Sequence, residues 1–288
     1  MKYEQTYVIE KQESFNLTHI LECGQCFRWE KEEDGSYTGV IKSGVINVKK
    51  EGNKIVFSGI CQNNLKTVVY NYFDLKTDYR KYKKVLSNID KHLKQSIEFG
   101  EGIRILEQDL WECIISFIIS ANNNIPRIKK IINRLSMEYG EEILWKGKKY
   151  YKFPTLDALS KASVKDLRNL GLGFRDKRVY NTTKMILEKQ VDLDGLKNME
   201  SSDVIRNELM RLDGVGEKVA DCIMLFSLKR VDVFPIDVWV RRVMNDLYIH
   251  NKNEEEVNKK ELKKLADEKF LGLSGIAQQY LFYWKRTG

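Results

Sequence analysis

Short apolar runs bounded by turn residues dominate the first part of the chain. Between residues 36 and 60, β-branched and aromatic residues are bounded by Asp-Gly-Ser, Lys-Ser-Gly and Glu-Gly-Asn-Lys, which predicts short antiparallel strands joined by tight turns. Residues 64–73 and 78–99 instead place apolar residues at helical spacing. We therefore expect an N-terminal antiparallel sheet domain that also carries helices, over residues 1–102.

From residue 103 onward the strand signals stop and helical segments follow one another. Ser163, with Asp166 three residues later, has the pattern of a capping box ahead of an apolar stripe. All three prolines fall in this part, where each marks a helix start or a loop: Pro126, Pro154 and Pro235. The predicted fold class is α+β, with the N-terminal sheet domain followed by an all-helical two-part region, residues 103–288, which contains a helix-hairpin-helix motif at about 199–228.

The balance of charges favours a polyanionic partner. The 288 residues include 49 Lys and Arg against 41 Asp and Glu, a formal net charge of +8, which suits nucleic acid, although many basic proteins bind none. No segment approaches the ~18 consecutive apolar residues that a membrane span needs. We therefore expect a cytoplasmic protein, monomeric and without a membrane partner.

The cysteines and histidines suggest little chemistry of their own. Five cysteines are scattered along the chain, as is typical of reduced thiols. Cys23 and Cys26 form a Cys-Gly-Gln-Cys pair that could indicate zinc or redox chemistry, but no second pair or His cluster completes a tetrahedral site. The three histidines lie far apart, so imidazole catalysis has no support.

The segment from 209 to 226 carries the first candidate chemistry. Gly214 and Gly216 lie between two segments of helical periodicity, where a Gly-Val-Gly turn with positive φ leaves the amides of the next helix start facing outward. Such amides, at the positive end of the helix dipole, suit a phosphate and hold DNA without reading its sequence. Taken alone, the motif fits an ordinary corner between helices equally well.

Lys218 and Asp237 add a reactive pair to this turn. An ammonium in the first turn of a helix opposes the helix dipole, which, together with partial burial, would lower the lysine pKa and favour a neutral amine nucleophile. Asp237 follows Pro235 at the expected N-cap of another helix. An ionised carboxylate there can stabilise positive charge at the anomeric carbon of a sugar as its glycosidic bond breaks. Alone, Asp237 would be only a helix cap.

These motifs resemble the helix-hairpin-helix superfamily of DNA glycosylases, in which Gly-Val-Gly-x-Lys-Val-Ala-Asp followed by Pro-x-Asp about twenty residues later marks a lysine-dependent glycosylase and lyase. Within it, four further segments resemble the 8-oxoguanine DNA glycosylases, and they occur in the family's order along nearly the whole chain. These segments are residues 24–29, 104–125, 170–175 and 275–282.

The resemblance implies a role for each matched residue around a flipped base. Lys218 would be the nucleophile that displaces the base, forms a Schiff base and permits β-elimination, with Asp237 as its electrostatic partner. Gly24 would accept the N7 hydrogen that distinguishes 8-oxoguanine from guanine, and Gln278 would meet the Watson–Crick edge. Phe282 and Cys222 would cover the two faces of the base; Lys218 and Cys222, four apart, share one helix face.

Other matched residues would hold the DNA. Asn122 would fill the gap left by the base, Phe174 would wedge the helix as a ring, and Arg127 and Arg175 would read the opposite cytosine, unless they are solvated or bind phosphate. Backbone amides would contact phosphate and backbone carbonyls would offer a structural cation site. The amides are those of Gly214, Gly216 and Val219; the carbonyls are those of Met210, Leu212 and Val215.

Three positions depart from the eukaryotic pattern of this family. Phe174 stands where a Tyr is usual, and Trp239 and Lys285 stand where a His and Asp pair is usual, which puts backbone contacts and opposite-base stringency in doubt. No cysteine follows Cys222, so no iron–sulfur cluster and no other cofactor is expected.

The expected partner is duplex DNA that contains a damaged guanine. Two alternatives remain open: a superfamily enzyme for another lesion, such as an oxidised pyrimidine or adenine opposite 8-oxoguanine, or a non-catalytic DNA-binding protein.

Overall fold

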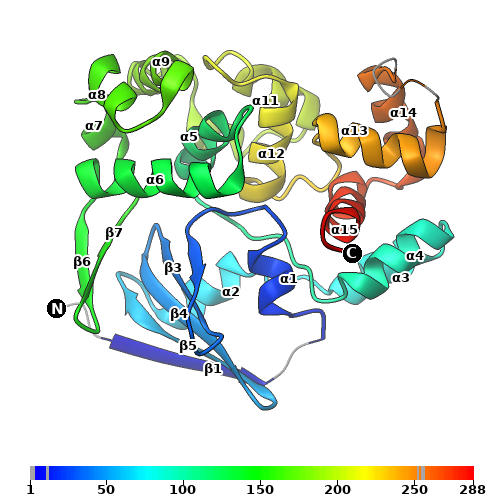
Figure 1. Ribbon diagram of the computed structural model, residues 1–288, viewed down its shortest axis with the longest axis horizontal. Helices are drawn as coiled ribbons and strands as arrows, with labels where there is room; N and C mark the ends of the chain where they lie inside the picture. Colours follow the sequence, from blue (N-terminus) through cyan, green and yellow to red (C-terminus); the bar gives the residue numbers. More distant parts are fainter. Residues whose placement is uncertain (1–3, 11–12, 252, 254–256) are drawn as a thin grey trace.

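A twisted antiparallel sheet forms one side of the molecule and a helical body forms the other (Figure 1). The computed structural model describes residues 4–10, 13–251, 253 and 257–288. The strands of the sheet lie in the order β1-β5-β4-β3-β2, and every neighbouring pair is antiparallel. These strands are β1 (Glu4–Glu10), β2 (Trp29–Lys31), β3 (Tyr37–Ile41), β4 (Gly44–Glu51) and β5 (Lys54–Cys61).

The tight turns predicted between the central strands are confirmed. Pairing of Ile41 with Gly44 leaves two residues between β3 and β4, and pairing of Glu51 with Lys54 leaves two between β4 and β5. Trp29 of β2 lies across Gly39 of β3, where an added Cβ would meet the indole ring at 2.3 Å. The Trp29 ring therefore packs over a position of β3 where only glycine leaves room for it.

Four helices follow or interrupt these strands: α1 (Leu17–Leu21), α2 (Leu65–Tyr72), α3 (Tyr79–Ser87) and α4 (Lys91–Phe99). The helix predicted over 78–99 is two helices, because Asp90 caps α4 by accepting the Leu93 N–H at 2.9 Å. Their apolar residues Leu86, Leu93 and Ile97 pack in the core of the helical body and not under the sheet. Residues 1–102 therefore contribute their last two helices to the other half of the molecule.

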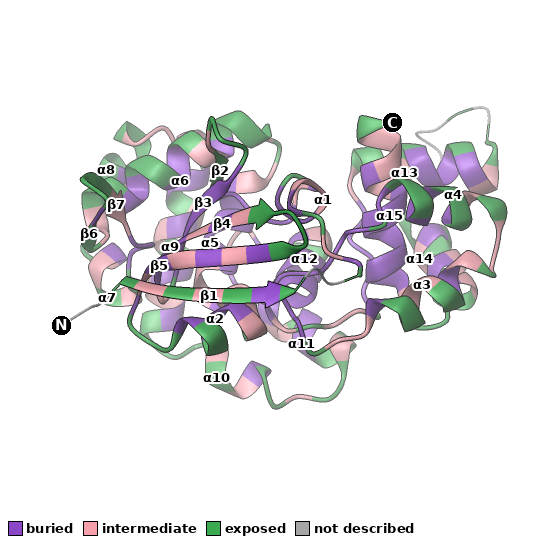
Figure 2. Ribbon diagram, turned by 90° about the horizontal axis from the view of Figure 1, so that it is seen from below, coloured by how far each residue is buried: buried purple, intermediate pink, exposed green. Residues whose placement is uncertain are grey.

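The helical body contains the remaining helices and one hairpin of strands. Its central pair, α5 and α12, pack against each other, and α15 is buried among α4, α13 and α14 (Figure 2). The helices are α5 (Leu110–Ser120), α6 (Ile125–Tyr139), α7 (Leu156–Leu159), α8 (Val164–Asn169), η1 (Gly173–Arg175), α9 (Asp176–Leu187), α10 (Leu193–Leu196), α11 (Ser202–Leu209), α12 (Glu217–Ser227), α13 (Val238–Met244), η2 (Asn245–Ile249), α14 (Lys259–Lys269) and α15 (Ser274–Thr287).

The prediction that this region is all-helical is wrong at one place. Strands β6 (Glu142–Trp145) and β7 (Lys148–Tyr151) form an antiparallel hairpin. Its two turn residues, Lys146 and Gly147, both have positive φ, +50° and +75°, as a type I′ turn requires. The hairpin buries Ile143 and Trp145 against the N-terminal sheet, so contacts between the two halves stabilise it.

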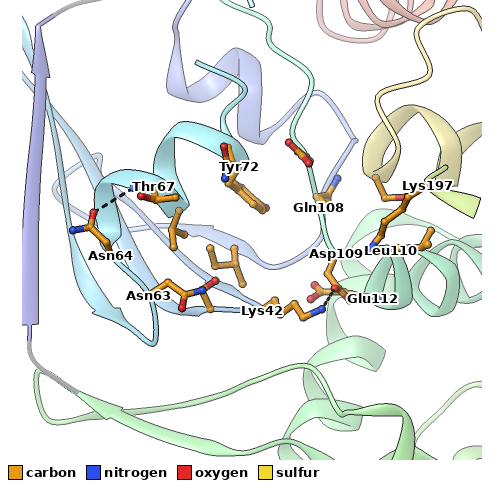
Figure 3. Close-up of a pocket in the computed structure, with 16 residues that line it drawn as sticks. Lys42, Asn63, Asn64, Thr67, Tyr72, Gln108, Asp109, Leu110, Glu112 and Lys197 are labelled. Carbon is orange, nitrogen blue, oxygen red and sulfur yellow. Dashed lines mark hydrogen bonds and ion pairs between the residues drawn. The ribbon is translucent and has the colours of Figure 1, made fainter. Parts of the chain in front are cut away.

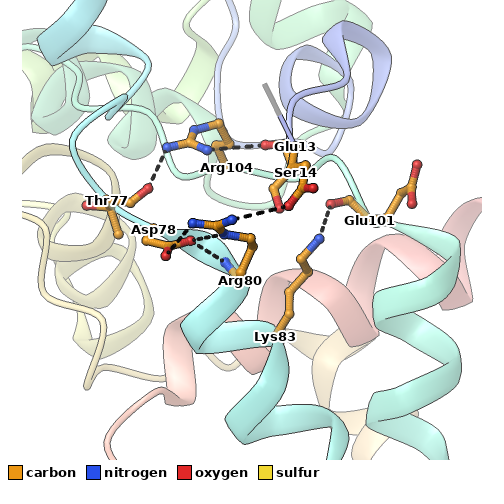
Figure 4. A network of polar contacts seen from close by, with 8 residues as sticks. All are labelled: Glu13, Ser14, Thr77, Asp78, Arg80, Lys83, Glu101 and Arg104. Atoms are coloured by element: carbon orange, nitrogen blue, oxygen red, sulfur yellow. Dashed lines mark hydrogen bonds and ion pairs between the residues drawn. The ribbon is translucent and has the colours of Figure 1, made fainter. Parts of the chain in front are cut away.

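A buried arginine joins the two halves at their covalent connection. Arg104 is 2% exposed, and its guanidinium donates to the carbonyls of Phe73 (3.1 Å) and Asp74 (2.6 Å). It also donates to the carbonyl of Thr77 at 2.9 Å (Figure 4). It also lies 4.3 Å from the ring centroid of Tyr79. These contacts fix the start of α3 on the sheet domain, although the helix packs elsewhere. Among the described residues, no helix is long and apolar enough to cross a membrane.

Candidate active site

The predicted helix-hairpin-helix is present as α11, the turn at 210–216 and α12. Gly214 has the expected positive φ, +85°, but Gly216 does not: its φ of −97° and ψ of −179° are those of extended backbone. Gly216 is the N-cap of α12 and supplies no side-chain cap, whereas Ser201 caps α11 by accepting the Val204 N–H. The start of α12 therefore keeps amides available to an external anion.

Lys218 lies in the first turn of α12 and is half-buried. Its Nζ is 5.6 Å from the ring centroid of Phe117, on α5. One helical turn later, Cys222 is buried, and burial raises the pKa of its thiol to about 11. The positive charge of Lys218 lowers that pKa and the negative charge of Asp237 raises it, so both charges lie within electrostatic reach of one thiol.

Asp237 is the N-cap of α13, as predicted. Its Oδ1 accepts the Val240 N–H at 2.8 Å, which fixes the carboxylate at the start of the helix. The segment between α12 and α13 returns the chain, so the charges of Lys218 and Asp237 both act on the Cys222 thiol. The structure thus brings together Lys218, Cys222 and Asp237, which are separated by up to nineteen residues in the sequence.

A small basic cavity of about 70 Å³ lies beside the lysine. Lys218 lines it together with Arg206, Asp221 and residues of α14 that sequence reasoning did not single out. The added α14 residues are Lys259, Lys260 and Lys263. The Lys-Lys-Glu-Leu-Lys-Lys run at this helix start was the available signal, but only the fold shows that it meets the hairpin.

The residues expected to surround the base come from opposite ends of the chain. Gly24 has a φ of +93°, and a Cβ there would lie 3.6 Å from the ring of Phe282 on α15. Gln278 lies one turn before Phe282 and is buried, its Oε1 accepting a hydrogen bond from Gln279 at 2.7 Å. The space that Gln278 and Phe282 share with Phe234 and Val240 has no room for a water molecule, so these side chains pack closely behind the expected base site.

The residues expected to occupy the gap in the DNA form a second group. They come from two separate segments of the chain, 122–127 and 174–175. Arg175 is buried and donates to the carbonyls of Ala121 (2.8 Å) and Asn122 (2.6 Å). Burial, and then the charges of Arg127 and Arg178, lower the pKa of Arg175. The Arg175 guanidinium therefore holds the Asn122 turn, where Asn122 itself has a φ of +50°.

The two other members of this group are accessible. Phe174 is 54% exposed, and the guanidinium of Arg175 lies 4.2 Å from its ring centroid. Arg127 is exposed at the start of α6, with its Nη2 3.8 Å from where a Cβ of Gly173 would lie. The Phe174 ring and the Arg127 side chain are therefore both at the surface.

The positions that depart from the family pattern form different contacts. Lys285 pairs with Asp246, Nζ to Oδ2 at 2.7 Å, and Trp239 is 39% exposed on α13. The predicted carbonyl site at the hairpin involves Leu212, whose carbonyl already accepts the Val215 N–H at 3.1 Å.

All five cysteines are free and buried, and the described part of the chain has no group of three His, Cys, Asp or Glu side chains suited to a metal.

A separate polar cleft lies between α2 and α5, away from all of these residues (Figure 3). It has a volume of about 450 Å³, and Lys42 bridges to Asp109 across it at 2.6 Å. None of the residues predicted for the site lines this cleft.

Two family models match the chain in succession. The model described as 8-oxoguanine DNA glycosylase, N-terminal domain, matches residues 7–114, and that described as HhH-GPD superfamily base excision DNA repair protein matches residues 115–268. Among curated relatives, the N-glycosylase/DNA lyase of Saccharomyces cerevisiae is 34% identical over 86% of this chain and 71% of its own length. The probable N-glycosylase/DNA lyase of Methanothermobacter thermautotrophicus is 30% identical over 86% and 81%.

Solved structures agree over nearly the full length. The 8-oxoguanine glycosylase/lyase of Clostridium acetobutylicum, in complex with double-stranded DNA containing cytosine opposite 8-oxoG, matches with a TM-score of 0.92 and 43% identity, over 99% of this chain and 97% of that one. The 3-methyladenine DNA glycosylase of Archaeoglobus fulgidus has the same fold, with a TM-score of 0.79, at 21% identity.

Proposed function

Because this chain belongs to the 8-oxoguanine DNA glycosylases of the HhH-GPD base excision repair superfamily, we propose a function at the level of its own residues. It is an N-glycosylase and DNA lyase that removes 8-oxoguanine opposite cytosine from duplex DNA and then cleaves the strand. The roles of individual residues are assigned from one observation. Lys218, Cys222 and Asp237 come together near a helix start that has no side-chain cap.

Lys218 is the nucleophile in this proposal. Its amine attacks the anomeric carbon, the new C–N bond replaces the glycosidic bond, and the base leaves with the bonding electrons and takes up a proton. Opening of the sugar ring gives a Schiff base on Lys218. Loss of a proton from the adjacent sugar carbon then expels the 3′ phosphate by β-elimination. Asp237 stabilises the positive charge that develops on the sugar, because its carboxylate is fixed in place by the helix cap.

The hairpin and the second group hold the DNA around that reaction. Amides at Gly214, Gly216 and Val219 bind backbone phosphate, while Asn122 fills the space left by the base and Arg127, with Phe174, faces the opposite strand. Gly24, Gln278, Phe282 and Cys222 enclose the base. The base reaches them only after it has left the DNA stack. The protein acts as a monomer without a cofactor.

A panel of duplexes tests the function. The protein is incubated with duplexes that carry 8-oxoguanine opposite cytosine, an oxidised pyrimidine, or adenine opposite 8-oxoguanine. We expect strand cleavage of the first duplex and little of the others. A protein that leaves the 8-oxoguanine duplex intact, while it cleaves another member of the panel, would require a different lesion in the same site.

A further inference from the structure

Arg286 lies at the base site, although no motif in the sequence pointed to it. Its guanidinium lies 5.0 Å from the ring centroid of Phe282. Nη1 lies 2.9 Å from the position that a Cβ of Gly24 would take, closer than any other atom. The guanidinium therefore occupies the corner between Gly24 and Phe282, the two residues that would contact the N7 edge and one face of the base.

The hydrogen bonds of Arg286 are incomplete. Nη2 donates to the backbone carbonyl of Glu22, which anchors one side of the guanidinium. Nη1 is fully buried and has no hydrogen-bond partner among the described residues. A buried donor without an acceptor destabilises the folded protein. Such a group is most simply explained by an acceptor that arrives with a ligand.

The chemistry of the lesion supplies that acceptor. Oxidation changes guanine at two adjacent atoms: N7 loses its lone pair and gains a hydrogen, and C8 gains a carbonyl oxygen. If the Gly24 carbonyl accepts the N7 hydrogen, the C8 oxygen points to the neighbouring corner, where only a donor is compatible. A guanidinium has donors and no acceptor, and in undamaged guanine the same corner would face a C–H group.

We propose that Arg286 reads the C8 oxygen of 8-oxoguanine by donating from Nη1, beside the Gly24 carbonyl that accepts from N7. The two groups form a donor and acceptor pair that matches the lesion at both changed atoms and mismatches guanine at both. This inference rests on the proposed function, since it places 8-oxoguanine against Gly24. The anchoring bond to Glu22 and the contact with Phe282 hold the guanidinium in position before the base arrives.

The test compares Arg286→Met, which keeps a long side chain without donors, with Arg286→Lys, which keeps a donor. Single-turnover excision of 8-oxoguanine opposite cytosine is measured beside strand cleavage at a preformed abasic site, which has no base to read. We expect Arg286→Met to lower the ratio of excision to abasic cleavage roughly 10- to 100-fold, the loss of one charge-assisted hydrogen bond. Arg286→Lys restores part of that loss.

A second substrate locates the contact on the base. In 8-thioguanine the hydrogen on N7 remains, but sulfur, a weak acceptor, replaces the C8 oxygen. The native protein excises it more slowly than 8-oxoguanine, and the penalty from Arg286→Met shrinks. An equal penalty on both bases would overturn the contact with the C8 oxygen, and an equal loss of abasic cleavage would indicate a contact with the DNA backbone instead.

Two controls separate these outcomes from other failures. Lys94→Met removes one exposed positive charge from α4, which packs against α15, and is expected to leave the ratio unchanged. Native protein that does not excise 8-oxoguanine would reject the proposed function itself, whereas active native protein with an unchanged Arg286→Met ratio would reject only the role of Arg286.

Discussion

At the scale of single residues, Lys218 has its positive charge at the end of a helix that disfavours a cation, beside a buried thiol. In the proposed mechanism this position serves the reaction, because the amine must reach a sugar whose phosphates bind the same helix start. Stability alone would select an acidic residue here, as at the neighbouring Glu217. Because the cation lowers the stability of the helix start, its presence at this position is evidence for a chemical role.

Borohydride trapping tests this role directly. Reduction during turnover on an 8-oxoguanine duplex should give a covalent protein–DNA adduct with the native chain and none with Lys218→Gln, which cannot form a Schiff base. Lys94→Gln serves as the control because its side chain is exposed on α4. If Lys218→Gln still formed the adduct, another amine would be the nucleophile.

Asp237→Asn separates the charge of the carboxylate from its capping role. Asparagine is as good an N-cap as aspartate, so the bond to the Val240 N–H persists and the free energy of unfolding changes by no more than about 0.5 kcal/mol. The excision rate should fall by on the order of 100-fold or more, because the fixed negative charge is lost. Asp237→Ala, measured beside it by urea unfolding, also loses about 1 kcal/mol of stability. If Asp237→Asn excised the base at the native rate, Asp237 would act only as a helix cap.

Residue-level prediction succeeded where a local rule constrains the residue. The cap at Asp237 and the capping box of Ser163 with Asp166 follow from short-range patterns and are confirmed. The positive φ expected in the Gly-Val-Gly turn is present at Gly214 and not at Gly216, because glycine permits that conformation without requiring it. Arg286 was missed since its significance depends on contacts with Glu22 and Gly24, about 260 residues away in sequence.

At the scale of elements, prediction failed where long-range packing decides. The hairpin of β6 and β7 has only four residues in each strand, and two-stranded hairpins are marginal alone. Its Ile143 and Trp145 pack with Val40 and Val45 of the N-terminal sheet, which the local sequence cannot reveal. The Lys-Gly pair between the two strands was the one local sign of a turn.

Helix α1 gives the fold a measurable pH dependence. Nδ1 of His19 accepts the Gly102 N–H at 3.2 Å, which ties α1 to the segment that follows α4. Burial lowers the pKa of His19 from its ordinary value of 6.5, and the nearby Glu101 partly opposes this. Since the unfolded chain binds the proton first, the stability from neutral His19 is complete above pH 6.5 and is lost as the pH falls below that value.

His19→Asn tests this dependence, because the amide oxygen can accept the Gly102 N–H at any pH. Urea unfolding between pH 7.5 and about pH 5 should show the native chain losing about 1 kcal/mol more than the variant, the worth of one hydrogen bond. Parallel pH profiles for the two proteins would show that His19 does not titrate against this bond.

At the scale of the whole molecule, some helices that follow the sheet in sequence pack in the other half of the molecule. Residues 79–99 follow the strands of the sheet in sequence, yet Leu86 and Leu93 are fully buried with α15 in the helical core. Arg104 spans the two parts through the carbonyls of Phe73 and Thr77. The order of the chain could not predict that α3 and α4 pack in the helical core.

A fragment of residues 1–102 therefore should not fold as a unit. It lacks Arg104 and leaves the apolar faces of α3 and α4 without α15. We expect it to bind a hydrophobic dye and to unfold in urea without a cooperative transition, whereas the full chain unfolds cooperatively. A sharp transition in the fragment, with native-like near-ultraviolet dichroism, would show that the sheet domain is autonomous.

The close packing behind the expected base site has a consequence beyond the reaction itself. Phe234, Val240, Gln278 and Phe282 leave no space among them for even a water molecule, so any shift of the Phe282 ring costs packing contacts. In the proposed mechanism, bound phosphates of the duplex offset that cost. A free oxidised base, or an oxidised nucleotide, brings too few of those phosphate contacts, so we expect it to compete only weakly with a lesion in DNA.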